Sequence, residues 1–396
     1  MSRLNIDVEY LADILRRLLE TPSPSGYTDA VARLTCEELG RLGVEYEMTR
    51  RGAIRARLPG KDAKPARAII AHLDTLGAQV KGLKSDGRLE LAPIGHWSSR
   101  FAEGARCTLF TDAGAYRGTI LPLKASGHVY NEQIDSQPTG WEHVELRVDA
   151  LGRDIRDLMR LGIAVGDIVS IDPRPEFLDN GFIVSRHLDD KAGCAVMFAA
   201  LKALRESKRT PSVDTLFLFS ISEEVGVGAS SVLTHDVASM VTIDNGTSAP
   251  GQNSSEFGVT IAMADMTGPF DYHLTRKLIR LCRENDITYQ RDLFRYYRSD
   301  CASAIEAGDD VRTALITFGI DASHGYERIH MHALRSLAEL VTAYAVSEIE
   351  IPRDADTTGT LKGFTEQPLE EAEETLVTTA GPDPVAAAAK PIGSKN

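Results

Sequence analysis

Strand-like apolar runs alternate with amphipathic helix patterns along most of this 396-residue chain. Residues 66–75 and 213–222 are apolar enough for strands buried on both faces, and residues 189–206 form a strong helix pattern between them. Strands that alternate with helices favour a mostly parallel sheet with helices on both sides. The sequence therefore predicts an α/β fold, a three-layer αβα domain.

The segment 75–175 interrupts this alternation. It contains short strand patterns such as GTILP, HVELRVDA and DIVSIDP between Gly, Pro and Asp turns, and it has few long helix patterns. We expect a small all-β, barrel-like domain inserted into the α/β domain. The expected division is a catalytic domain of residues 1–74 and 176–352, an insert of residues 75–175, and a disordered tail of residues 353–396 rich in Asp, Thr, Gly, Pro and Ala.

The remaining elements follow from the same patterns. The expected helices are 7–20, 27–42, 270–286, 299–308 and 331–349. The expected strands are 44–50, 53–59, 239–245, 257–266, 287–294 and 311–321.

Charge and cysteine content exclude several classes of protein. The net charge of -13 repels phosphate backbones, so nucleic acid is not an expected partner. No apolar stretch approaches the roughly 18 residues that span a membrane, and no secretory signal is visible, so we expect a cytoplasmic protein without a membrane partner. The five cysteines are scattered, which argues against a disulfide framework and a thiolate zinc site.

Side chains that can bind metals stand at five places, each at or near the end of an expected strand or the start of a helix. Loops at strand ends of an open α/β sheet converge on one crevice. Taken singly, each place has an ordinary explanation: a structural histidine, a helix cap or a solvated acidic loop. The five places are His72 with Asp74, Asp189 with Asp190, Glu223 with Glu224, Asp244, and His330.

Together these residues offer enough nitrogen and oxygen ligands for two zinc-like ions and one free base. Asp74, two residues after His72, could orient that imidazole. In the Glu223-Glu224 pair, one carboxylate could bind metal while the other takes a proton from water. A glycan hydrolase is a poor alternative, because adjacent acids cannot straddle a glycosidic bond at the roughly 5–9.5 Å separation required.

The motifs AHLD, LDDKAG, SEEVG, TID and the final IH resemble those of co-catalytic aminopeptidases. The chain is most similar to metallopeptidase family forty-two, the glutamyl and deblocking aminopeptidases that form tetrahedral dodecamers, over about residues 8–350. Within that family it resembles the branch linked with the osmoprotectant N-acetylglutaminylglutamine amide.

The resemblance implies a role for each residue. Asp189 would bridge two metal ions, with His72 and Asp244 completing one site and Glu224 and His330 the other. Glu223 would be the general base, and Asp74 would orient His72. The resemblance also implies a cis bond between Asp189 and Asp190, and a homo-oligomer, from dimer to dodecamer, built through the insert.

The chain departs from the family pattern around the expected pocket. His187 stands where a small residue is common, Arg328 where a Tyr is common, and residues 297–300 read Tyr-Arg-Ser-Asp in place of Gly-Gly-Thr-Asp. We therefore do not transfer a preference for acidic N-terminal residues. His187, His324 and His332 are interpreted as structural or supporting residues, and Arg298 and Arg328 as either substrate-binding groups or members of salt bridges.

Three functions remain open on the sequence. The first is a metallo-aminopeptidase that cleaves the N-terminal bond of peptides or of a small dipeptide. The second is an amidohydrolase or deacylase acting on an osmolyte-like dipeptide. The third is a non-catalytic metal-binding assembly protein, against which the extra Glu223 argues. Zinc is the expected metal, with cobalt and manganese as alternatives.

Overall fold

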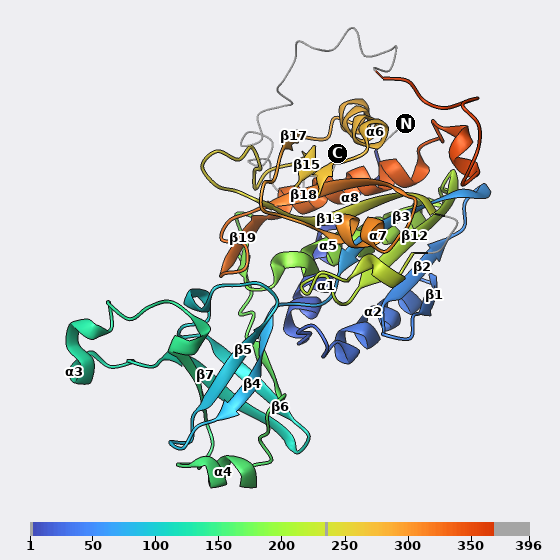
Figure 1. The fold of residues 1–396 in the computed structure, drawn as a ribbon. Helices are drawn as coiled ribbons and strands as arrows, with labels where there is room; N and C mark the ends of the chain where they lie inside the picture. Colours follow the sequence, from blue (N-terminus) through green and yellow to red (C-terminus); the bar gives the residue numbers. More distant parts are fainter. Residues whose placement is uncertain (1–2, 234–236, 368–396) are drawn as a thin grey trace.

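An eight-stranded mixed sheet forms the centre of the larger of two structural units (Figure 1). The computed structural model describes residues 3–233 and 237–367. The strands lie in the order β1-β2-β12-β3-β13-β18-β14-β17. Their bounds are β1 Glu45–Met48, β2 Ile54–Leu58, β3 Asp62–His72, β12 Val213–Ser220, β13 Val237–Thr247, β14 Val259–Ala262, β17 Tyr289–Asp292 and β18 Arg312–Ile320.

The four central strands β12, β3, β13 and β18 are parallel to one another. Antiparallel strands flank them, β2 beside β12 and β14 beside β18. The mostly parallel core expected from the sequence is therefore present. All four central strands end at the same edge of the sheet, and this edge receives the polar residues that follow them.

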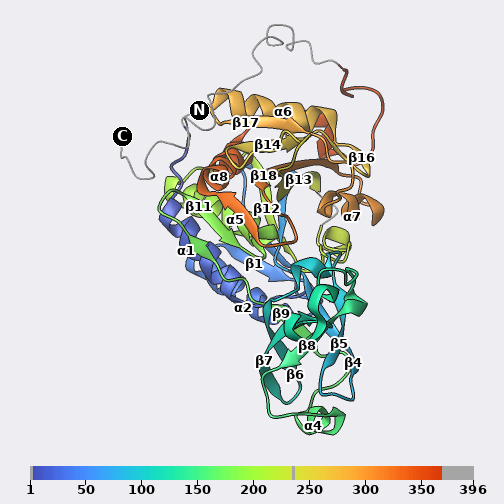
Figure 2. The ribbon, with the colours of Figure 1, turned by 90° about the vertical axis from the view of Figure 1, so that its left-hand side faces the viewer.

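Helices cover both faces of the sheet, which confirms the three-layer arrangement. Figure 2 shows α1, α5 and α8 on one side of the sheet and α7 on the other. The helix bounds are α1 Val8–Glu20, α2 Asp29–Arg41, α5 Leu188–Ser207, α6 Tyr272–Glu284, α7 Asp300–Glu306 and α8 Met331–Val346.

Helix α1 illustrates how the sequence specifies these elements. Asp7 caps it by accepting a hydrogen bond from the Tyr10 amide at 3.0 Å. Its expected apolar face is fully buried, and each such leucine or isoleucine contributes about 2 kcal/mol of transfer free energy. The face consists of Leu11, Ile14, Leu15, Leu18 and Leu19.

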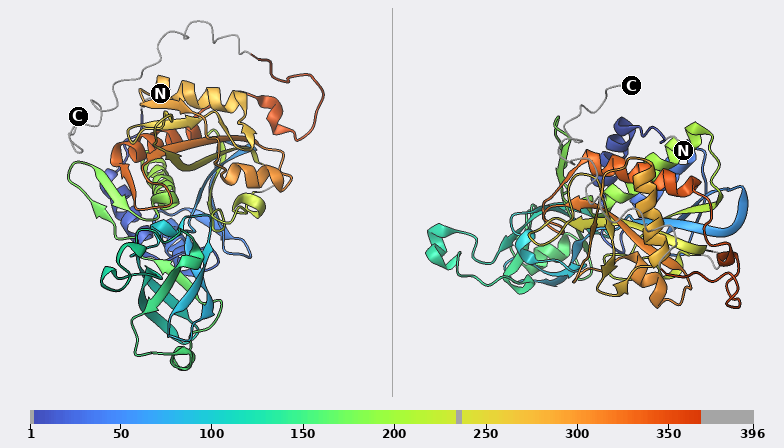
Figure 3. Two further views of the ribbon diagram at one scale, coloured as in Figure 1. Left: turned by 60° about the vertical axis from the view of Figure 1, so that its left-hand side comes forward. Right: turned by 90° about the horizontal axis from the view of Figure 1, so that it is seen from above.

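A closed six-stranded barrel with its own apolar core projects from the α/β unit (Figure 3). It accounts for the helix-poor segment and confirms the inserted all-β domain. The strand bounds are β4 Gly77–Leu83, β5 Leu89–Ile94, β6 Arg106–Thr111, β7 Gly114–Pro122, β8 Val144–Val148 and β9 Ile168–Ile171. Helix α4 (Ile155–Arg160) lies at its far end, and α3 (Gly127–Tyr130) lies on an arm that stands away from it (Figure 1).

A small sheet next to the barrel was not expected from the sequence. Strands β10 (Glu176–Phe177) and β11 (Phe182–Ser185) follow the barrel, and β11 pairs with β19 (Glu327–His330), almost 150 residues later in the chain. The five cysteines are all buried and free. Among the described residues, no helix is long and apolar enough to cross a membrane.

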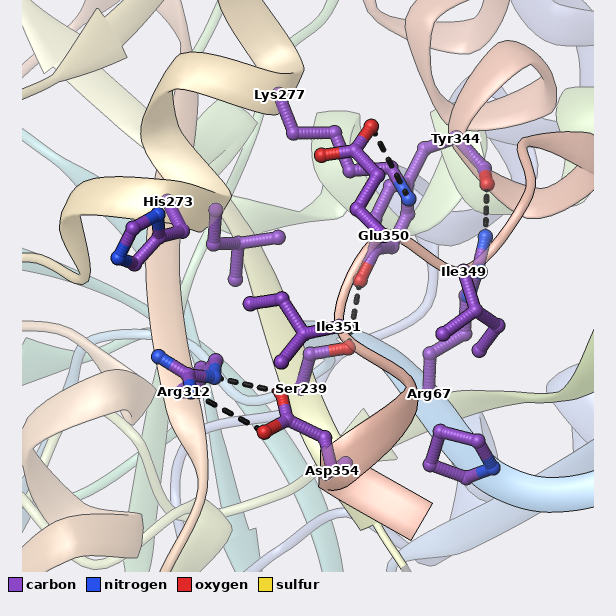
Figure 4. A pocket seen from close by; sticks show the side chains of 13 residues that line it. Arg67, Ser239, His273, Lys277, Arg312, Tyr344, Ile349, Glu350, Ile351 and Asp354 are labelled. Carbon is purple, nitrogen blue, oxygen red and sulfur yellow. Dashed lines mark hydrogen bonds and ion pairs between the residues drawn. The ribbon is translucent and has the colours of Figure 1, made fainter. Parts of the chain in front are cut away.

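The chain beyond the last helix is ordered for longer than the composition indicates. Residues 352–355 form the short helix η5 (Pro352–Ala355). The Arg312 guanidinium donates from Nε to Asp354 at 2.6 Å, beside a cavity at the sheet edge opposite the polar residues (Figure 4). The expected disordered tail therefore begins too early. Its residues 368–396 lie outside the described residues.

Candidate metal centre

The parallel strands bring five of the expected site residues to one edge of the sheet. His72 is the last residue of β3, Asp244 lies near the end of β13, and Glu223 and Glu224 follow β12. Asp189 comes from the start of α5, which packs on β3 and β13. Four different elements thus deliver nitrogen and carboxylate ligands to the same place.

These side chains form two adjacent groups that could each hold a cation. The ligand atoms of His72, Glu223 and Asp244 lie within 4.8 Å of one another, as do those of Asp189, Glu224 and His324. Both groups offer nitrogen and oxygen, the donor set that suits zinc and similar divalent ions.

Asp189 links the two groups. Its Oδ1 lies 3.2 Å from Nε2 of His72, and its Oδ2 lies 3.3 Å from Nε2 of His324. Each oxygen of one carboxylate therefore faces a different histidine. The peptide bond between Asp189 and Asp190 is cis, as the family resemblance implied.

The acids of the centre are buried together, and burial disfavours their charged forms. Burial raises the pKa of Glu224 to about 8, and burial with the nearby Asp189 charge raises the pKa of Asp244 to about 8. Burial also raises the pKa of Glu223 well above its usual range. Burial opposes the ionisation of Asp189 too, but hydrogen bonds with His324 and His72 outweigh it and lower its pKa. A divalent cation would favour the ionised acids, so this donor set fits a metal.

Asp74 positions the loop that carries the two glutamates. Its side chain is completely buried, accepts hydrogen bonds from the amides of Glu223 (3.1 Å) and Glu224 (3.3 Å), and accepts one from Ser25 Oγ (2.5 Å). The contact with His72 is made mainly by the backbone: Nδ1 lies 2.9 Å from the Asp74 carbonyl oxygen and 3.6 Å from the carboxylate. Both contacts fix the ring with Nε2 toward the centre.

His330, the expected ligand of the second group, lies elsewhere. Its Nε2 is 3.0 Å from the Asn180 carbonyl oxygen, and its Nδ1 accepts the His332 amide at 3.0 Å. Its ring packs against Phe182 and Phe257. The expectation for His330 is thus corrected, because the residue belongs to strand β19 and both ring nitrogens are engaged there. His324 takes the place beside Asp189 and Glu224.

Sequence reasoning also missed Glu327, a buried carboxylate that holds this part of the centre. It accepts hydrogen bonds from the amides of Leu188 (2.7 Å), Asp189 (3.3 Å) and His324 (3.0 Å). Glu327 therefore ties the start of α5 to the turn that carries His324. The local signal was a His and a Glu three residues apart in a Gly-containing turn directly after a buried strand.

Three other singled-out residues contact neighbouring parts of the protein. Nε2 of His187 lies 3.1 Å from the Ile171 carbonyl oxygen of the barrel, and burial lowers the pKa of His187 to about 3. Arg298 pairs with Glu306, and Arg328 pairs with Glu256, so both arginines form salt bridges, one of the two alternatives.

A small, narrow pocket adjoins the second group. Asp189, Glu224 and His324 line it from the α/β unit. Leu76, Trp97 and Ile171 line it from the barrel side. The insert therefore helps to shape the space next to the candidate metal centre.

Sequence comparison relates this chain to known aminopeptidases. The family model of the M42 glutamyl aminopeptidases matches residues 52–340. The putative aminopeptidase YhfE of Bacillus subtilis is 38% identical over 336 residues, which cover 85% of this chain and 97% of that protein. The glutamyl aminopeptidase of Lactococcus lactis is 26% identical over 230 residues, 57% of this chain and 62% of its own length.

Solved structures with low sequence identity share the fold. A TET aminopeptidase from a marine-sediment thaumarchaeote superposes with a TM-score of 0.79 at 16% identity, covering 88% of this chain and 98% of its own. The TET1 peptidase of Pyrococcus horikoshii gives a TM-score of 0.75 at 21% identity, over 85% and 99% of the two chains. The chain therefore belongs to the M42 glutamyl aminopeptidase family and is a metal-dependent aminopeptidase.

Proposed function

We propose that this aminopeptidase uses two divalent ions that share Asp189. His72 and Asp244 would complete one site, and Glu224 and His324 the other. The observation that carries the proposal is the placement of the two Asp189 oxygens, 3.2 Å from one histidine and 3.3 Å from the other. Two ions would supply Lewis acidity and a water of lowered pKa at this position.

Charge balance supports two ions rather than one. The two groups contain four carboxylates, those of Asp189, Glu223, Glu224 and Asp244, which carry a charge of -4 when ionised. Two divalent cations offset this charge, whereas one leaves half of it buried. The mixed imidazole and carboxylate donors suit zinc, cobalt and manganese.

Glu223 is the residue we assign as general base. Its side chain is 15% exposed, against 4% for Glu224 and 5% for Asp189, so it is the most accessible acid of these three. In this role its carboxylate takes a proton from the attacking water and returns it to the nitrogen of the leaving amine. Asp74 would keep Glu223 in place through the backbone hydrogen bond that it accepts.

The substrates we propose are peptides or small dipeptides with a free amino end. The test is hydrolysis, by metal-reconstituted protein, of paired free and N-acetylated dipeptides that begin with Gln, Glu or Leu. The Glu223→Gln variant should bind the same ions and lose about 100-fold or more in kcat, the usual contribution of a general base. Glu306→Gln, which removes a surface partner of Arg298, is the matched control and should match the parent.

The panel separates the possible substrates. Cleavage of the free dipeptides alone supports the aminopeptidase, whereas cleavage of the acetylated ones alone would point to an amidohydrolase acting on an osmolyte-like dipeptide. If two ions bind and no member of the panel is cleaved, the substrate assignment is wrong.

We further propose that the chain forms a homo-oligomer through the barrel domain. The TET1 peptidase of Pyrococcus horikoshii is described as assembling into a tetrahedron or a large octahedral shell. In this chain, the arm that carries α3 stands away from the barrel, and Val129 on it is 73% exposed (Figure 1). A projecting arm of this kind is accessible to a second copy, and Val129 offers a position on it at which contact can be tested. The mass of the full chain in solution tests this proposal.

A further inference from the structure

We propose that Asn245 is a positioning residue of the metal centre, holding the carboxylates of Asp189 and Asp244 in the arrangement in which they can bind a common ion. The inference rests on the proposed function, since it concerns ligands of the first site. Asn245 was not among the residues that the sequence motifs singled out.

The contacts of Asn245 reach two elements. Its Nδ2 donates to Oδ2 of Asp189 at 2.7 Å and to Oδ1 of Asp244 at 3.2 Å. Its backbone amide also donates to Oδ1 of Asp244 at 2.6 Å. Asp189 comes from the start of α5 and Asp244 from β13, so one side chain connects ligands that are far apart in sequence.

The orientation of the Asn245 amide follows from electrostatics. The opposite orientation would place its oxygen against two carboxylates, which repel it, so the nitrogen faces the acids. The side chain is only 3% exposed, and within the described part of the chain its Oδ1 has no hydrogen-bond partner. Burying an oxygen without a donor is unfavourable, and the two bonds to carboxylates offset that cost.

The backbone of Asn245 is rigid enough for this task. β13 remains paired with β18 through this position, with Asn245 opposite Phe318. A residue fixed in a sheet can hold its neighbours more precisely than a loop residue can. Both bonds of Asn245 to Asp244 use Oδ1. For Asp189, Oδ1 remains directed at His72.

Loss of this amide should weaken metal binding more than folding. Without it, the two carboxylates repel each other and can adopt other rotamers, so the site is no longer arranged before the ion binds. Residues that orient metal ligands typically account for about 10- to 100-fold in metal affinity or activity. We expect an effect of this size on one of the two ions that would share Asp189.

The test compares Asn245→Leu, which keeps the branched shape in a larger side chain and removes the donors, with Thr242→Val as the control. Thr242 is a buried polar residue on the same strand whose Oγ1 lies 3.0 Å from Cys301 Sγ, outside the centre. Zinc affinity is measured by competition with a chromogenic chelator, ions per chain by elemental analysis, and kcat and KM with a free dipeptide. Asn245→Ser, which keeps a small donor, is the second variant if the leucine variant does not fold.

We expect Asn245→Leu to lose about 10- to 100-fold in affinity for one of its two ions, with kcat reduced and KM within about threefold. Asn245→Ser should be intermediate, and Thr242→Val should match the parent. The leucine variant is decisive, or the serine variant if the leucine variant does not fold. If it binds both ions with parental affinity and keeps the parental kcat, the role of Asn245 is wrong and the proposed function stands. A parent that binds fewer than two ions overturns the proposed function and this inference with it.

Discussion

His324→Ala and His330→Ala should affect different properties of the protein. The two residues lie six positions apart, and the sequence motif favoured His330, whereas the structure places His324 beside Asp189 and Glu224. Removal of His324 should therefore reduce metal binding and turnover. Removal of His330 should reduce stability and leave both largely intact.

The size of the His330 effect follows from its contacts. Its ring packs against Phe182 at 4.9 Å and Phe257 at 4.8 Å, and aromatic contacts of this kind contribute about 1 kcal/mol each. Its two ring nitrogens make two further contacts, to Asn180 and His332, of about 1 kcal/mol each. Four such contacts set an upper value of about 4 kcal/mol, and because single contacts are not strictly additive we expect a loss of about 2–4 kcal/mol.

For His324 the expected effect is on the metal. Loss of a residue that only orients a ligand costs about 10- to 100-fold, so loss of a ligand itself should cost more than about 100-fold in affinity for one ion. His324→Ala should then retain one bound ion and lose most of its kcat.

Denaturant unfolding in the presence of a chelator measures the stability of both variants without the contribution of bound metal. Ions per chain and kcat are measured on metal-loaded protein. If His330→Ala loses an ion and its activity, while His324→Ala keeps two ions and parental kcat, the assignment of His324 is wrong.

Two further predictions concern other parts of the molecule. Burial lowers the pKa of Lys277, beside the cavity of Figure 4, to about 8. Between about pH 8 and 10.5, the unfolded chain therefore binds more protons than the folded chain. The free energy of unfolding of the parent should rise with pH in this range. The free energy of unfolding of Lys277→Met minus that of the parent should therefore fall by about 2–3 kcal/mol between pH 7 and pH 10, as measured by denaturant unfolding. A difference that does not depend on pH would contradict this reasoning. Val129→Asp should place a charge in the proposed contact between copies and lower the mass measured by light scattering, whereas an unchanged mass would exclude the arm from the interface.

The sequence was sufficient for the layers and for most of the centre. Residues 68–71 and 216–219 are continuous apolar runs, which are typical of central parallel strands, and strands of this kind end at one edge of the sheet. The positions of His72, Glu223, Glu224 and Asp244 at that edge follow from this rule. Asp189 follows from the helix pattern that begins there.

The rule that parallel strands end at one edge of the sheet could not distinguish His324 from His330. Residues 327–330 pair with residues 182–185. Local sequence patterns do not predict a four-residue strand whose partner is so distant in sequence. That pairing directs His330 toward Phe182 and Phe257. Similarly, the role proposed for Asn245 depends on how close α5 lies to β13. The periodicity of apolar residues along the sequence does not specify that distance.

The place at which the barrel is inserted has a consequence for how this enzyme can diversify. The first barrel strand, β4, begins three residues after Asp74, and β10 and β11 separate the last barrel strand, β9, from Asp189. Barrel-side residues Leu76, Trp97 and Ile171 also wall the cavity beside His324. Substitutions at these barrel residues would change the wall of this pocket without changing the strands that carry the candidate ligands. The candidate ligands and part of the pocket wall beside them thus come from parts of the chain that have separate apolar cores.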